Sequence, residues 1–346
     1  MLTLGIETSC DETSCAVLGG RDEVKSNIVS SSLFRHRPFG GIVPEIASRH
    51  CLEQIDFVFH QALEQAKVRA QDLDLIAVTQ GPGLIGSLLV GVSFAKALSL
   101  DLNIPLVAVN HLEAHLEAAF VTNEGKFPGV ISSRRPARFI GLLVSGGHTH
   151  LTLHEKEKVI GLGETVDDAV GEAYDKVAKI MGLGYPGGPI LDRLAKEGNP
   201  RAVAFTKPKQ KNRYDFSFSG IKTAVLYYYQ REHSKHKSQQ ALDCFHRDLA
   251  ASFQNAVVSW LVEKTMAAAK EYSVSDIVVG GGVSANAALR TRLTAAGEED
   301  GLCIRFPHLS LTNDNAAMIA RRGLELFKKG RRAAATLSGD PNLRMV

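Results

Sequence analysis

The sequence predicts an α/β protein of two lobes with related plans and a ligand between them. Twice along the 346-residue chain, two strands joined by a polar turn are followed by alternating helices and strands, which is the pattern of an α/β lobe. The chain is also about as long as two average domains. Many of its 31 glycines follow predicted strands, where backbone turns tightly or approaches a ligand closely.

The first lobe is expected over residues 1–130. Strands are predicted at 2–6, 14–18 and 24–31, the first two joined by the polar residues 7–13. Apolar residues at helical spacing predict a long helix over 44–67. A buried strand at 75–79, a helix at 87–100, a strand at 106–109 and a helix at 112–120 complete this lobe.

The second lobe is expected over residues 131–346, after a loop-like segment at 121–138. Its first two strands, 139–145 and 150–153, flank the pair Gly146-Gly147. Then come helices at 169–181, 188–196 and 243–272, a strand at 276–279, and helices at 285–296 and 313–329. The last helices are candidates to pack back on the first lobe.

Composition narrows the class of protein. The chain has 40 Lys and Arg against 37 Asp and Glu, for a net charge of +3, which gives no bulk attraction to nucleic acid or to a membrane. Five cysteines without a C-x-x-C pair indicate neither a disulfide framework nor a thiolate zinc site. No targeting peptide is visible, and the apolar stretch at 84–95 is too short to span a bilayer. We therefore expect a cytoplasmic protein without a membrane partner.

Two histidines, His111 and His115, lie four residues apart in a predicted helix. Side chains at this spacing share one helix face, so both imidazoles can reach one metal ion. The alternative is a pair of ordinary polar helix residues. Zincin proteases carry a general-base Glu directly after the first His, whereas Leu112 stands there in this chain. The spacing therefore favours a metal site and disfavours that protease mechanism.

Three turns rich in glycine or hydroxyl groups follow strands, at residues 5–13, 144–150 and 280–286. Exposed N–H groups in such turns cradle phosphate, and Asn286 is placed to contact a base or ribose. Each of the three turns is equally consistent with a plain hairpin turn or strand-to-helix turn that binds no ligand. Asp175 is either a ribose ligand or a solvated carboxylate, and Asp314 is either a metal ligand or a helix N-cap.

Two basic segments, 201–213 and 231–237, are of the kind that usually form solvated faces or loops. The first runs into three aromatic residues, Tyr214, Phe216 and Phe218. Basic residues beside aromatic rings also suit an RNA backbone with stacked bases, so this segment is an alternative RNA contact.

Together these motifs resemble the tRNA N6-adenosine threonylcarbamoyltransferase family of the bacterial type (TsaD), from about residue 2 to residue 328. The motifs of the first half are LGIETSCDET at 4–13, GGIVPEIASRH at 40–50, GPGLIGSL at 81–88 and NHLEAH at 110–115. Those of the second half are SGGHT at 145–149, GEAYDK at 171–176, GGP at 187–189, GGGVSAN at 280–286 and TNDN at 312–315.

The resemblance implies a fold of two RNase H-like lobes in the actin/hexokinase/Hsp70-like arrangement, with a ligand cleft between them. It implies transfer of a threonylcarbamoyl group from L-threonylcarbamoyl-adenylate to N6 of adenosine thirty-seven in tRNAs that read ANN codons, with release of AMP. An ATPase or sugar kinase of the same fold is the alternative, because it would use the same phosphate turns. A metallo-endopeptidase and a non-catalytic partner protein are less consistent with the motifs.

Site residues follow from the resemblance, motif by motif. The ligands of one divalent metal, iron as first choice and zinc as second, would be His111, His115 and Asp314. The adenylate would contact Leu143, Val144, Ser145, Gly146, Gly147, Asp175, Gly188, Asp192 and Asn286. Catalytic roles would fall on Asp11, Glu12 and Ser145, with Glu12 as the expected acceptor of the amine proton.

The expected partners are tRNA, a smaller paralogous protein (TsaB) and a P-loop ATPase (TsaE). The chain has no G-x-x-x-x-G-K-[ST] motif, which agrees with an ATPase supplied from outside. Two departures from the family pattern stand out: the loop at 121–138 is long, and His150 stands where Gln is more usual. We expect His150 to be a polar strand-edge residue and not a third histidine ligand.

Overall fold

The computed structural model describes residues 1–20, 22–122, 134–156 and 158–345. The chain forms two compact units, Met1–Arg135 with Pro307–Val346, and Pro136–Phe306. The chain thus leaves the first unit and returns to it, so that the helix expected at 313–329 belongs to the unit that contains the N-terminus. The boundary expected near residue 130 falls at 123–133, outside the described residues.

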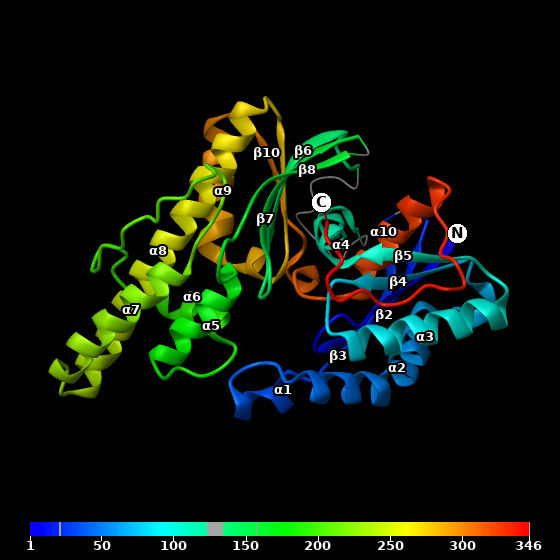
Figure 1. Ribbon diagram of the computed structural model, residues 1–346, viewed down its shortest axis with the longest axis horizontal. Helices are drawn as coiled ribbons and strands as arrows, with labels where there is room; N and C mark the ends of the chain where they lie inside the picture. The colour runs from blue at the N-terminus through cyan, green and yellow to red at the C-terminus, as the bar shows by residue number, and fades with distance from the viewer. Residues whose placement is uncertain (21, 123–133, 157, 346) are drawn as a thin grey trace. The chain divides into compact units, whose positions relative to one another are not determined.

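The first unit is built on a five-stranded sheet in the order β3-β2-β1-β4-β5 (Figure 1). An antiparallel meander consists of β1 (Leu2–Glu7), β2 (Glu12–Gly19) and β3 (Glu23–Ser31). Two parallel strands, β4 (Leu75–Gly81) and β5 (Leu106–Asn110), extend it beyond β1. Successive residues of a strand face opposite sides, and in β2 Cys15 and Val17 join one apolar cluster while Ala16 and Leu18 join another.

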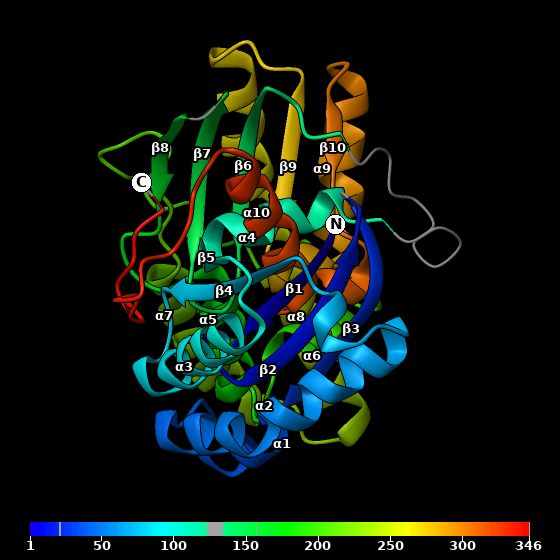
Figure 2. The same cartoon turned by 90° about the vertical axis from the view of Figure 1, so that its right-hand side faces the viewer.

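Helices cover both faces of this sheet. On one face lie α2 (Pro44–Ala66) and α3 (Ile85–Leu102), and on the other lie α4 (His111–Glu117) and α10 (Ala316–Lys328), as both views show (Figures 1 and 2). Shorter helices are α1 (Leu33–His36) and the 3-10 turns η1 (Arg37–Phe39), η2 (Ala70–Asp72), η3 (Ala118–Phe120) and η6 (Leu309–Leu311). Burial on both faces explains why the parallel strands β4 and β5 are mainly apolar.

Helix α3 is, among the described residues, the one helix long and apolar enough to cross a membrane by length and composition. The apolar stretch at 84–95, from which no membrane span was expected, is shorter than this 18-residue helix. A helix packed on a sheet meets the same criterion, and Leu88, Val92 and Ala95 of α3 are buried within the first unit. The length of α3 is therefore weak support for a membrane span.

The second unit repeats the plan of the first. Its sheet has the order β10-β9-β6-β7-β8, with an antiparallel meander of β6 (Arg138–Val144), β7 (Thr149–Glu155) and β8 (Lys158–Glu164). Two strands parallel to β6, β9 (Asp276–Gly280) and β10 (Cys303–Arg305), complete it. The predicted two-lobe α/β fold is therefore confirmed, although apolar patterning missed the half-exposed β8 and the three-residue β10.

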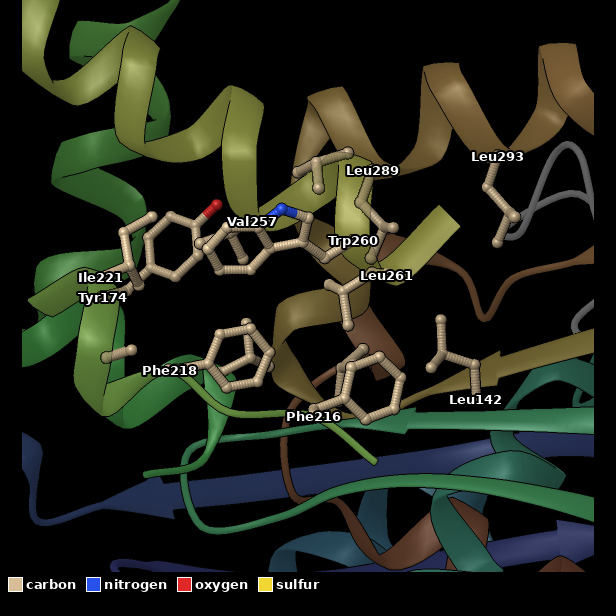
Figure 3. Packing of buried hydrophobic residues seen from close by; sticks show 14 of the residues in the cluster. Leu142, Tyr174, Phe216, Phe218, Ile221, Val257, Trp260, Leu261, Leu289 and Leu293 are labelled. Carbon is tan, nitrogen blue, oxygen red and sulfur yellow. The ribbon is translucent and has the colours of Figure 1, made fainter. Parts of the chain in front are cut away.

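The core of the second unit lies between its sheet and its helices (Figure 3). The helices are α5 (Val170–Ile180), α6 (Gly187–Ala195), α7 (Ser219–Glu232), α8 (Gln239–Glu271) and α9 (Ala287–Glu299), with 3-10 turns η4 (His233–Lys235) and η5 (Gly282–Ala285). Helix α7 was not predicted, because only Ile221 and Val225 of it are buried. Helix α8 begins earlier than expected, since Ser238 caps it by accepting a hydrogen bond from the backbone N–H of Ala241.

Candidate functional site

The structure brings together the three residues predicted to hold a metal. Helix α4 starts directly after β5, where the Asn110 side chain accepts hydrogen bonds from the next turn of backbone and fixes the helix start. Asp314 lies just before α10, which packs against α4. One ligand atom from each of His111, His115 and Asp314 lies within 4.8 Å of the others, and the histidines are only 7% and 1% exposed.

The donor set fits a divalent transition metal. Nε2 of His115 lies 3.1 Å from Asp314 Oδ1, and Nε2 of His111 lies 3.6 Å from the same oxygen. Nε2 of His115 thus faces the Asp314 carboxylate, while Nδ1 of the same ring is buried without a hydrogen-bond partner among the described residues. Two imidazoles and one carboxylate suit iron or zinc and leave coordination positions open.

The two histidines differ electrostatically. Burial by itself lowers the pKa of His111, but the charges of Asp314 and Glu7 outweigh it and raise the pKa to about 9. Burial and the neighbouring His111 lower the pKa of His115. The pair therefore holds one proton readily and a second one poorly, as expected where a dication is to take the place of protons.

Glu7 is a site residue that the sequence analysis assigned only to a polar turn. It is fully buried at the end of β1, and its Oε2 lies 3.0 Å from Nδ1 of His111. The same carboxylate accepts hydrogen bonds from the Thr79 hydroxyl at 2.6 Å and from the Ser9 backbone N–H at 2.5 Å. A carboxylate on the far nitrogen of a metal-binding histidine orients the ring. The sequence feature that could have identified Glu7 as a site residue is a charged side chain at the end of a mainly apolar strand.

The turn after β1 lies close to Asp314. Burial, the charge of Asp314 and the neighbouring Asp11 raise the pKa of Glu12 well above its ordinary value. Burial, Asp11 and Asp314 likewise raise the pKa of Cys10. Glu12 therefore holds a proton more readily than an ordinary Glu does.

The turn between β6 and β7 in the second unit exposes backbone atoms to solvent. The Ser145 hydroxyl accepts a hydrogen bond from the His148 N–H at 3.1 Å, which closes the turn. Gly146 and Gly147 are exposed, and a Cβ at either would meet no atom. Leu143 and Val144 are fully buried, so neither is accessible to a ligand. Of the predicted residues here, the two glycines are exposed and Ser145 is half-buried.

Asp175, Gly188, Asp192 and Asn286 lie in the same unit. Asp175, whose pKa is raised by burial, accepts a hydrogen bond from the Gly187 N–H at 2.7 Å, so α6 begins against α5. Oδ1 of Asp192 is buried without a hydrogen-bond partner among the described residues. Asn286 caps α9 by accepting from the Leu289 N–H at 2.9 Å. An unpaired buried carboxylate oxygen fits a hydroxyl donor such as a ribose.

The aromatic residues after the basic segment do not form a stacking surface. Tyr214, Phe216 and Phe218 are buried in the core of the second unit, because the segment runs beside α8 and turns its rings inward. Lys207 pairs with Glu263 at 2.6 Å, and Arg213 pairs with Glu271 at 2.7 Å. The alternative of base stacking at these rings is therefore wrong.

The two departures from the family pattern have different outcomes. His150 is the second residue of β7, and its Nδ1 lies 3.5 Å from Glu164 on the neighbouring strand β8. It belongs to the second unit, where its contact with Glu164 is that of the polar strand residue that the sequence predicted. Most of the loop at 121–138 lies outside the described residues.

Comparisons with known proteins agree with the motifs. A family model described as tRNA N6-adenosine threonylcarbamoyltransferase (TsaD) matches residues 23–321. A protein of that name from Thermosipho africanus is 48% identical, covering 100% of both chains. One from Bacillus subtilis is 46% identical, covering 100% of this chain and 96% of its own.

Solved structures show the fold alone. Full-length HypF, in a phosphate- and nucleotide-bound form, matches with a TM-score of 0.58 at 13% identity, over 96% of this chain and 47% of HypF. HypF from T. kodakarensis matches with a TM-score of 0.56 at 15% identity, over 95% of this chain and 48% of its own. The two-lobe actin/hexokinase-like class is consistent with these matches and with the two sheets of like topology.

Proposed function

The chain belongs to the tRNA N6-adenosine threonylcarbamoyltransferase family, and from this premise we propose that it transfers a threonylcarbamoyl group to tRNA. The donor in this proposal is L-threonylcarbamoyl-adenylate, and the acceptor is N6 of adenosine thirty-seven in tRNAs that read ANN codons. The C–O bond between carbamoyl carbon and phosphate breaks, a C–N bond forms, and AMP and one proton leave.

The observation that supports this proposal best is the buried group of His111, His115 and Asp314. These residues would hold one divalent metal ion, iron or zinc. When bound, such an ion supplies a Lewis acid and a template for phosphate oxygens. Glu7 and Ser9 contact Nδ1 of His111, so the ring is held with Nε2 toward Asp314.

The chain's own residues supply the remaining roles in the proposal. Glu12, with its raised pKa, accepts the proton that the amine loses as the C–N bond forms. The exposed backbone of Gly146 and Gly147 offers N–H groups to phosphate oxygens. Asp175 and Asp192 accept hydrogen bonds from ribose hydroxyls. An unpaired anticodon-loop adenosine presents its amine without the opening of a duplex.

The proposal includes three partners. The tRNA is the substrate, a smaller paralogous protein (TsaB) pairs with this chain, and a P-loop ATPase (TsaE) acts with them. The family name supports tRNA as substrate, and the chain lacks a P-loop motif of its own. The two other proteins are proposed on the family resemblance.

A reconstituted assay tests the proposal. L-threonylcarbamoyl-adenylate, unmodified tRNA and the two partner proteins are mixed with the chain, and modified adenosine is measured by mass spectrometry of tRNA nucleosides. We expect His111→Ala to lose about a hundredfold or more in rate, because losing only a hydrogen-bond partner of a ligand histidine typically costs ten- to a hundredfold. The matched control is His60→Gln, because His60 is an exposed histidine four residues from its partner Asp56.

The same assay separates the transferase from an ATPase or kinase of this fold. Undiminished modification by the His111→Ala protein would exclude the metal role. ATP turnover by the chain alone, unchanged in that variant and without tRNA modification by the unaltered protein, would favour the ATPase.

A further inference from the structure

Gln254 connects two segments that carry candidate adenylate residues. It lies on α8 and is only 5% exposed. Its Oε1 accepts a hydrogen bond from Nδ2 of Asn286 at 2.7 Å and a second from the Tyr174 hydroxyl at 3.3 Å. Tyr174 belongs to α5, and Asn286 precedes α9. One side-chain oxygen thus joins three helices of the second unit.

The surroundings of this oxygen are apolar. Phe253 packs edge-on against the Tyr174 ring, with centroids 5.0 Å apart. Val257 and Leu261 follow on α8, and Leu289 faces them from α9 (Figure 3). A hydroxyl or amide N–H left unpaired here would cost about 1–3 kcal/mol. Tyr174 and Asn286 are therefore both directed toward Gln254.

The hydrogen bonds fix the orientation of the Asn286 amide. Its Oδ1 accepts from the Leu289 N–H at 2.9 Å, while its Nδ2 donates to Gln254. Turning the amide over would lose both bonds, because each partner would then face a group of its own kind. The Asn286 amide is therefore held in one defined orientation.

Through these hydrogen bonds, Gln254 also affects the positions of Asp175 and of the turn at residues 280–286. Asp175 is the residue after Tyr174 and holds the start of α6 through the Gly187 N–H. On the other side, Gly281 has a positive φ of 89° and packs against the backbone of Val144. A shift of the Asn286 segment against α5 would move both places where the adenylate is proposed to bind.

We propose that Gln254 is a positioning residue of the nucleotide site, which sets the Asn286 amide and α5 relative to each other. This inference rests on the proposed function, because it takes the adenosine moiety of the adenylate as the ligand of the second unit. Gln254 itself does not touch the ligand in this proposal. Its contribution is to binding and not to the chemical step.

The test compares four variants of the full-length chain. Gln254→Leu removes the acceptor, Gln254→Glu keeps an acceptor oxygen, and Tyr174→Phe removes one of the two hydrogen bonds. Thr265→Val is the matched control, because Thr265 is a buried α8 residue whose hydroxyl, among the residues that the structure describes, bonds within its own helix, to the Leu261 carbonyl at 2.7 Å. AMP affinity is measured by calorimetry, and KM for the adenylate and kcat are measured in the reconstituted assay.

We expect Gln254→Leu to weaken AMP binding and raise KM about tenfold, equivalent to about 1.4 kcal/mol, with kcat nearly unchanged. Tyr174→Phe should weaken AMP binding less than Gln254→Leu does. Gln254→Glu and Thr265→Val should bind AMP within about threefold of the unaltered chain. Circular dichroism checks that each variant is folded, and bound metal, held in the first unit, should not change.

Two results would overturn the inference. Unchanged AMP affinity and KM in folded Gln254→Leu would show that Asn286 is held without Gln254. Equal losses in Gln254→Leu and Thr265→Val would show a general effect of altering α8. If the unaltered chain binds no AMP, the nucleotide site of the proposed function is itself wrong, and the inference is wrong with it.

Discussion

Glu7 Oε2 lies 3.0 Å from Nδ1 of His111, although the two residues are 104 positions apart in the chain. Glu7 ends β1 and His111 begins α4, so the contact ties the central strand of the first sheet to the helix of the candidate metal site. Both residues are buried. A buried carboxylate in this place orients the ring and adds negative charge near a cation.

Replacing Glu7 by Gln should therefore weaken metal binding. We expect about ten- to a hundredfold lower affinity for Fe²⁺ or Zn²⁺, the usual effect of losing a partner of a ligand histidine. Affinity is measured by competition with a chelator of known strength. Glu45→Gln is the control, because Glu45 is an exposed helix residue paired only with Arg49 at 2.8 Å among the described residues. Equal affinities for both variants would contradict the role of Glu7.

Removing metal should lower the melting temperature of the unaltered chain. A ligand that binds only the folded state stabilises it by mass action, by about 2.7 kcal/mol at a hundredfold excess over Kd. His115→Ala should melt at the same temperature with and without a chelator, because its site lacks one of the imidazoles. Calorimetric scans with and without chelator measure this. A chelator effect of equal size in His115→Ala would place the metal elsewhere.

Arg322 and Glu113 should be energetically coupled. Nε of Arg322 donates to Glu113 Oε2 at 2.8 Å, and both side chains are mostly buried, so the pair joins α10 to α4, the helix that carries His111 and His115. A double-mutant cycle of Arg322→Met and Glu113→Gln, measured by urea unfolding, should give about 1–3 kcal/mol of coupling. Additive losses from the two single variants would show that the helices are held by apolar packing alone.

Gly5 should tolerate no side chain. A Cβ at Gly5 would collide with the backbone of Ala316 and Ala320, because α10 lies directly on β1. Gly5→Ala should lower the free energy of unfolding by about 3 kcal/mol, at the upper end of overpacking costs. At Gly41, where a Cβ would meet no atom, the same change should have little effect. Denaturant unfolding compares the two, and equal effects would refute close packing at Gly5.

The folded chain should lose stability in acid because Asp168 becomes protonated. Burial acts to raise the pKa of Asp168, but hydrogen bonds from Lys176 and Lys222 outweigh it and lower the pKa below 3.8. A carboxyl whose pKa is lowered by folding stabilises the folded state above its unfolded pKa, and this contribution is lost as the pH falls through the folded pKa.

Asp168→Asn should therefore lower the free energy of unfolding by about 2 kcal/mol at neutral pH, the usual loss for hydrogen bonds to a charged group. The difference in free energy of unfolding between this variant and the unaltered chain should shrink below about pH 4, the region where an unfolded Asp titrates. Urea unfolding between neutral pH and the acid limit of folding measures this. A deficit independent of pH would show that the ion pairs are not the cause.

Much of the fold was predictable from the sequence because it depends on local pattern. The strands at 2–6 and 14–18 and the helical spacing in α2 are properties of short segments. The spacing of His111 and His115 predicted two imidazoles on one helix face for the same reason. Helix α7 and strands β8 and β10 were missed, because they bury too few residues or are too short to show a period.

What only the tertiary structure decided is which distant residues meet. Asp314 reaches the two histidines because the chain returns to the first unit after residue 306, and no local pattern encodes that return. Glu7 became a partner of His111, and Tyr214 became a core residue, through contacts between segments far apart in sequence. By itself the sequence determined most of the elements and the candidate ligands, since propensity and periodicity act over a few residues. Packing determined how those ligands are oriented and charged, since burial and neighbouring charge exist only in the folded chain.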